Sequence, residues 1–155
     1  MAIGLRSLLD FKILEYSSVW VPVLLIASIC ITIIVFCDLE YRSGKPNMFL
    51  SIFGLILLSF SYAYGTYVSL NCVFDSSKPE IHVASILKKR MTSGKTTTYY
   101  LELTPWGKQT EPDEVSVSKA LYNSFQENDD VNIYLMKGKF EIPWFEITDK
   151  NTMLK

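Results

Sequence analysis

Charged residues are missing from two long stretches of this 155-residue chain. No Asp, Glu, Lys or Arg occurs in the 22 residues from Tyr16 to Cys37 or in the 29 residues from Pro46 to Phe74. The fifteen basic and sixteen acidic side chains all lie in the rest of the chain, with a net charge of −1. A soluble domain spreads charge over all its surface elements. This segregation therefore excludes a single water-soluble globule, a disordered chain and a basic nucleic-acid-binding protein.

Metal-binding and redox residues are also scarce. His82 is the single histidine, and the three cysteines, Cys30, Cys37 and Cys72, all lie in or next to the uncharged stretches. A zinc site needs about four ligands, so we interpret His82 as a structural or surface residue and expect no metal and no cofactor. The region after residue 75 has no cysteine pair for a disulfide.

Signatures of catalysis are equally weak. Ser93-Gly94-Lys95-Thr96 resembles the end of a phosphate-binding loop, but the glycine required five residues before Gly94 is replaced by Lys89. No helical pattern follows, so a hairpin turn is the better interpretation. The chain also has no Gly-x-Ser-x-Gly segment of the kind that presents a nucleophilic serine. We therefore predict that the protein is not an enzyme and has no catalytic residues.

The two uncharged stretches are long enough to cross a bilayer as helices. A hydrocarbon core about 30 Å thick needs roughly 20 helical residues, and segments 19–37 and 47–70 have that length. A polar loop over residues 38–46 joins them, which predicts a transmembrane hairpin with both chain ends on one side. A cleaved signal peptide is disfavoured, because the first apolar run is too long and no small-residue cleavage site follows it.

Aromatic residues mark one end of the predicted hairpin. Tyr16 and Trp20 begin the first span, and Tyr62, Tyr64 and Tyr67 lie near the end of the second. These ends are neighbours in a hairpin, so we expect one interfacial aromatic belt. Neither span contains the intramembrane charge that transport sites usually require, which argues against a transporter.

Small residues form a row on the second span. The row consists of Ser51, Gly54, Ser61, Gly65 and Ser69. Such a face allows two helices to approach closely. Two interpretations stay open: packing against the first span, at Ala27, Ser28 and Thr32, or contact with a second copy or another protein's helix.

The pattern after residue 75 changes to the alternation typical of strands. It predicts strands over residues 81–90, 96–104, 114–117, 131–136 and 140–147, with Pro143 confining the last to a sheet edge. Ser118 is expected to cap a short helix that reaches residue 126, with Ala120, Leu121 and Phe125 facing inward.

The predicted fold class is an α+β membrane protein. It combines a two-helix transmembrane hairpin with a small, mainly antiparallel β domain, as a sheet or partly closed barrel, with one short helix. The expected order is an amino-terminal interfacial segment 1–18, helix 19–37, loop 38–46, helix 47–70, β domain 76–147 and flexible tail 148–155.

Candidate binding residues lie in the β domain. The basic run at its first strand is either a solvated strand end or a contact for anionic lipid headgroups. Three large aromatics in predicted loop or edge positions are either core residues or part of a binding surface. The candidate binding surface comprises Lys88, Lys89, Arg90, Trp106, Trp144 and Phe145.

Basic residues near the spans favour cytoplasmic chain ends. Those outside the hairpin are Arg6, Lys12, Lys78, Lys88, Lys89 and Arg90, against Arg42 and Lys45 in the loop. The excess of six over two falls to three over two when the run 88–90 is assigned to a folded domain.

Four segments of the chain resemble a group of small, uncharacterised bacterial inner-membrane proteins. The segments are residues 93–101, Trp106-Gly107, 115–122 and 138–145, of which the last carries a Gly-x-x-x-x-Pro-Trp-aromatic signature. The resemblance covers residues 50–147. It implies a bacterial inner-membrane location and a hairpin followed by a β domain, and it supplies no catalytic residues.

These features predict a non-enzymatic membrane-anchored interaction module whose β domain binds a protein partner or the membrane surface. One alternative is an immunity protein that neutralises a bacterial toxin through its hairpin or β domain, which a toxin gene immediately upstream would favour. Another is an accessory subunit of a membrane enzyme or envelope complex. The expected partners are the lipid bilayer and a protein, or a second copy, bound through the second helix, and no nucleic acid is expected.

Overall fold

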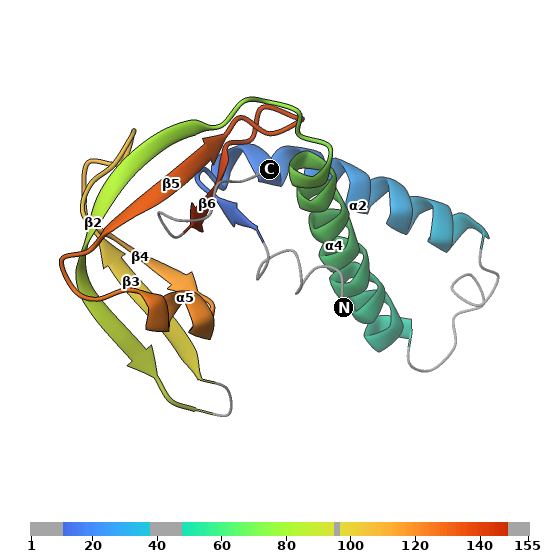
Figure 1. Cartoon of the computed structure of the whole chain (residues 1–155). Helices are drawn as coiled ribbons and strands as arrows, with labels where there is room; N and C mark the ends of the chain where they lie inside the picture. The colour runs from blue at the N-terminus through green and yellow to red at the C-terminus, as the bar shows by residue number, and fades with distance from the viewer. Residues whose placement is uncertain (1–10, 38–47, 95–96, 149–155) are drawn as a thin grey trace. The chain divides into compact units, whose positions relative to one another are not determined.

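The computed structural model describes residues 11–37, 48–94 and 97–148. The predicted loop 38–46, residues 1–10 of the interfacial segment and the tail beyond residue 148 lie outside the described residues. The chain divides into two compact units (Figure 1). One contains the residues up to Ser77 together with Met136–Trp144, and the other contains Lys78–Leu135 and the residues from Phe145 onward. The segment Met136–Trp144 thus belongs with the helices, although it lies within the predicted β domain 76–147.

Two long apolar helices form most of the first unit. Helix α2 spans Ser17–Cys37 and helix α4 spans Met48–Val73. Both are long and apolar enough to cross a membrane. Large apolar side chains such as Leu25, Phe36 and Phe49 are exposed on the isolated chain. A helix that is apolar all round is suited to a hydrocarbon environment rather than to water.

The two helices contact each other along a seam of buried side chains. This seam includes Val19, Val23, Ala27, Ala63, Tyr64, Val68 and Cys72. The four-residue spacing of the three α2 residues keeps their side chains on one face of that helix. Ala27 is buried as expected, but Ser28 and Thr32 are exposed. The Thr32 hydroxyl instead donates to the Ser28 carbonyl at 2.8 Å, which satisfies it within its own helix.

The strands form one mainly antiparallel sheet. They are β1 (Lys12–Ile13), β2 (Glu80–Thr92), β3 (Thr98–Leu103), β4 (Asp113–Val117), β5 (Asp130–Met136) and β6 (Trp144–Thr148). Their order is β1-β6-β5-β2-β3-β4, and the β2–β3, β2–β5 and β3–β4 pairs are antiparallel. The predicted α+β fold, with two long apolar helices and a small curled β domain, is therefore confirmed.

The long strand β2 belongs to both halves of the sheet. Its first half pairs with β5 and its second half with β3. The register shifts between Ile86 and Lys88, and a bulge of this kind bends and twists a strand; Figure 1 shows β2 as a long curved ribbon. The buried side chains of β2, β3 and β5 include Ala84, Ile86, Leu101, Leu103, Val131 and Ile133.

The short helix α5 (Lys119–Ser124) differs in part from its prediction. Ser118 caps it as expected, because its Oγ accepts from the Leu121 N–H at 3.2 Å. Phe125 is buried, but Ala120 is exposed, so the expectation that Ala120 faces inward was wrong. The helix ends at Ser124, which leaves fewer than two turns to define an inward face.

The prediction that Pro143 confines the last strand to a sheet edge was also wrong. Strand β6 begins after Pro143, at Trp144, and has β1 on one side and β5 on the other. Strand β1 has only two residues, too few for an alternating pattern. Pro143 lacks a donor, but its carbonyl accepts from the Leu14 N–H at 2.9 Å, so the proline fits beside β1 without an unpaired group.

Candidate functional site at the end of helix α4

The last turns of α4 contain a buried asparagine that binds a distant segment. Asn71 is 0% exposed. Its Nδ2 donates to the Ile142 carbonyl at 2.9 Å, and its Oδ1 accepts from the Phe140 N–H at 2.9 Å. The backbone carbonyl of Asn71, near a helix end that leaves such acceptors unpaired, receives the Lys139 N–H at 2.9 Å. These three bonds fix the turn formed by residues 138–142 against the helix.

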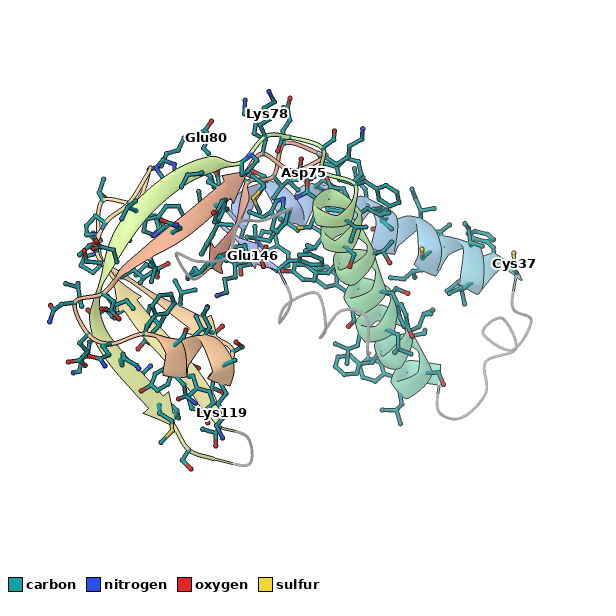
Figure 2. All side chains as sticks on the ribbon, in the orientation of Figure 1. Cys37, Asp75, Lys78, Glu80, Lys119 and Glu146 are labelled. Carbon is teal, nitrogen blue, oxygen red and sulfur yellow. The ribbon has the colours of Figure 1, made fainter. Side chains whose placement is uncertain are left out.

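Asp75, which is labelled in Figure 2, follows the end of α4 and binds the same segment. Its Oδ2 accepts from the Gly138 N–H at 2.8 Å and from the Trp144 indole Nε1–H at 2.9 Å, and its Oδ1 accepts from the Ser77 N–H at 2.8 Å. Partial burial alone would raise the pKa of Asp75, but hydrogen bonds from Ser77, Trp144 and Gly138 outweigh burial and hold it below its ordinary 3.8. Asp75 is therefore an ionised acceptor at neutral pH.

We call Asn71, Asp75, Gly138 and Trp144 the clasp. Gly138 is required at its position, because its φ is +79° and an added Cβ would lie 2.3 Å from the Ile142 carbonyl oxygen and 2.5 Å from Asn71 Nδ2. Only glycine adopts such a conformation at little cost and leaves room for a close neighbour. The glycine and the tryptophan of the carboxyl-terminal signature thus have structural roles in the clasp.

Aromatic rings surround the clasp on the helical unit. The Phe140 ring stacks on Tyr67 with centroids 4.9 Å apart and planes at 4°. The Phe11 ring meets Trp144 edge-on at 5.7 Å. Lys139 and Phe140 are both exposed on the turn. Aromatic rings and lysines at the end of an apolar helix are typical of a membrane–water interface.

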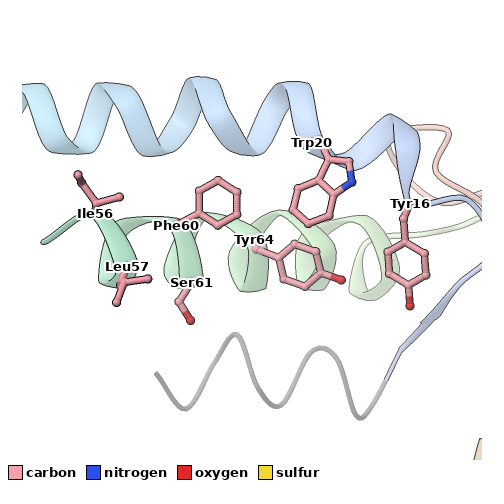
Figure 3. A pocket seen from close by; sticks show the side chains of 7 residues that line it. All are labelled: Tyr16, Trp20, Ile56, Leu57, Phe60, Ser61 and Tyr64. Atoms are coloured by element: carbon pink, nitrogen blue, oxygen red, sulfur yellow. The ribbon is translucent and has the colours of Figure 1, made fainter. Parts of the chain in front are cut away.

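A groove of about 630 Å³ is lined by side chains of α4 and of the residues at the start of α2 (Figure 3). Trp20 stacks on Phe60 in this lining, with ring centroids 6.0 Å apart and planes at 21°, and its ring lies 6.2 Å from that of Tyr64. The lining side chains are Tyr16, Trp20, Ile56, Leu57, Phe60, Ser61 and Tyr64. Figure 3 shows the polar tips of Tyr16, Trp20 and Tyr64 toward one end, and Ile56 and Leu57 at the other.

The basic run predicted as a binding surface is largely paired within the β domain. Lys89 donates to a backbone carbonyl just after α5 at 2.5 Å and lies 4.2 Å over the Tyr122 ring. Arg90 bonds both carboxylate oxygens of Glu114, at 2.6 and 2.5 Å, and these bonds raise the pKa of Arg90. Lys88 is exposed. Two of the three cations therefore stabilise the domain itself.

The three predicted aromatics lie in two different places. Trp106 and Phe145 are 4% and 5% exposed, with ring centroids 5.0 Å apart, so they belong to the interior of the β domain. Trp144 belongs to the clasp. His82 lies 5.9 Å from Trp106, and no group of three or more His, Cys, Asp or Glu in the described ranges could hold a metal ion.

The small-residue row on α4 has different surroundings along its length. Gly65 is buried, and Ser61 and Ser69 are half-buried. Ser51 is exposed, and a Cβ added to Gly54 would meet nothing within 4 Å. The first half of the row therefore faces open space on the isolated chain.

Sequence reasoning missed Asn71 and Asp75. Two features of the sequence could have pointed to them. Asn71 is an amide near the end of the second uncharged stretch, and Asp75 is the first charged residue after that stretch. Their partners are about seventy positions later, beyond any local pattern. Comparison with protein-family models, curated proteins and solved structures found no match to the chain.

Proposed function

We propose that this protein is a non-enzymatic, membrane-anchored interaction module of the bacterial inner membrane. Helices α2 and α4 cross the bilayer as a hairpin, with both chain ends in the cytoplasm. The exposed apolar side chains of both helices support this anchoring, because such surfaces are stable in hydrocarbon. The Phe140 ring and Lys139, in the turn of residues 138–142, are of the types found at the level of the lipid headgroups.

The apolar outer face of β2 carries the interaction role. Ile81 and Val83 are 60% and 59% exposed, while the residues between and after them, His82 and Ala84, are half-buried and buried. The solvent face of an antiparallel sheet is normally polar. Leu87, at the bulge, is also exposed. The β domain binds its protein partner through this outer face of Ile81, Val83 and Leu87.

Affinity capture from gently solubilised membranes tests this role. The full-length wild-type chain should recover a specific partner, whereas the double variant Ile81→Ser/Val83→Ser should recover about tenfold less, as expected for a loss near 1.4 kcal/mol. Lys119→Ser, at an exposed position on α5, is the matched control and should behave as wild type. Equal recovery by the double variant would show that the partner binds elsewhere.

Alkaline extraction and reporter fusions test the anchoring. The chain should stay with the membrane pellet at high pH, because two apolar helices resist extraction. A carboxyl-terminal reporter that is active only in the cytoplasm should be active. Activity of a periplasm-dependent reporter at the same position would reverse the proposed orientation.

A further inference from the structure

The groove lined by the start of α2 and by α4 has a polarity gradient along its length. Ile56 and Leu57 form one end, and the rings of Trp20 and Phe60 form the middle. The hydroxyl-bearing rings of Tyr16 and Tyr64 form the other end (Figure 3). From residue 56 to residue 64 a helix rises about 12 Å. The groove therefore runs from the predicted aromatic belt toward the apolar interior of the bilayer.

Helix α4 leads from the polar end of the groove to the turn of residues 138–142, which we call the clasp turn. Tyr67 follows Tyr64 by about one turn of α4, and its ring stacks on Phe140. The backbone of that turn is fixed by Asn71, and the exposed side chains beside Phe140 are Lys139 and Glu141. The surfaces are thus aliphatic, aromatic, hydroxyl-bearing and charged in turn, so their polarity rises in the direction in which the polarity of a phospholipid rises from tail to headgroup.

The size of the lining side chains distinguishes among apolar occupants. Close packing of a second helix in a membrane favours small residues at the contact. This groove is lined by Trp20, Phe60, Leu57 and two tyrosines, with Ser61 as its small residue. A flexible hydrocarbon chain fills an irregular space between bulky rings, whereas a regular helix does not.

We propose that the groove holds one acyl chain of a resident phospholipid, with the headgroup at the Tyr16 and Tyr64 end. The inference rests on the proposed membrane anchoring and deepens it, because the occupant comes from the bilayer itself. The acyl chain lies in the groove beside the stacked Trp20 and Phe60 rings. The phosphate lies at the level of the aromatic belt and the clasp turn.

Lipid retention by the purified full-length chain tests the proposal. After detergent extraction and washing, native mass spectrometry should show one phospholipid bound to the wild type. Ser61→Phe places a ring in the groove and should lower the occupied fraction about tenfold. Leu58→Phe is the matched control, because Leu58 is exposed on α4 outside the groove, and it should retain the lipid. Equal retention by Ser61→Phe and wild type, or a wild type without lipid, would overturn the proposal.

A photoreactive phenylalanine analogue at position 60 identifies the occupant in intact membranes. A phospholipid adduct supports the proposal, and an adduct with the mass of two chains would show that a second copy occupies the groove instead. Alkaline extraction distinguishes a failure of lipid binding from a failure of membrane anchoring. A chain that stays in the membrane but binds no lipid overturns only this inference, whereas a chain that is extracted overturns the anchoring as well.

Discussion

The Trp144 indole nitrogen donates a 2.9 Å hydrogen bond to Oδ2 of Asp75, 69 positions earlier in the chain. The same oxygen accepts the Gly138 N–H. Asp75 follows the end of α4, and Gly138 and Trp144 flank the turn that Asn71 also holds. One carboxylate therefore joins the end of an apolar helix to both ends of a distant turn.

The bond between Trp144 and Asp75 should stabilise the folded chain. Trp144→Phe and Asp75→Asn should each lower the free energy of unfolding by about 1–3 kcal/mol, because the first removes the donor of a charge-assisted bond in a partly buried site and the second removes the charge of its acceptor. The double variant should lose less than the sum of the single losses, because the two side chains share the bond. Thermal unfolding in detergent micelles measures all three.

The same substitutions test whether Trp144 has a binding role instead. Trp144→Ala should lose stability and partner capture together. A Trp144→Ala chain that stays folded and yet captures no partner would contradict the structural role of this residue.

The stability supplied by Asp75 should depend on pH. Its pKa in the folded chain is lower than its ordinary 3.8, so the ionised form is favoured by folding. This contribution is fully present above pH 3.8 and is lost as the pH falls through the folded pKa. The difference in stability between wild type and Asp75→Asn should therefore shrink on acidification from pH 6 to pH 3. A difference that stays constant over this range would show that Asp75 is not the titrating group.

Two glycines should respond oppositely to alanine. Gly138→Ala should destabilise the chain by about 2 kcal/mol or more, because a left-handed φ alone costs a residue with a Cβ about 1–2 kcal/mol and the Cβ also meets Ile142 and Asn71. Gly54→Ala is the matched control: its Cβ meets nothing within 4 Å, and alanine favours the helix. Comparable melting temperatures for Gly138→Ala and wild type would show that the turn is not constrained as described.

Replacement of Gly65 tests the small-residue row. We predict that the row Ser61, Gly65 and Ser69 contacts another helix, and Gly65 is buried, so a leucine there should disrupt that contact, in keeping with the role of small residues in membrane helix contacts. Crosslinking between engineered cysteines in membranes measures the helix pair. A crosslinking pattern unchanged by Gly65→Leu would exclude this face from helix contact.

The β domain shows which residues sequence patterns placed correctly and which they did not. The strands predicted over residues 96–104 and 131–136 correspond to β3 and β5, whose buried side chains include Leu101, Leu103, Val131 and Ile133. Ala120 is exposed because its helix is too short to define an inward side. Lys89 and Arg90 looked like a solvated or lipid-binding run, but their partners, at α5 and on β4, come from segments that only folding brings together.

The two apolar helices and the α+β fold class could be predicted from the amino-acid sequence alone. Both follow from local chemistry: an uncharged run suits hydrocarbon, and alternation with period two places one face of a strand inward. The clasp, the pairing of β1 with β6 and the groove beside Trp20 could not be predicted and are seen only in the folded chain. These depend on contacts between residues far apart in the chain, such as Asp75 with Trp144. Such contacts leave no periodic signal, because each one needs only a single polar or aromatic residue at each end.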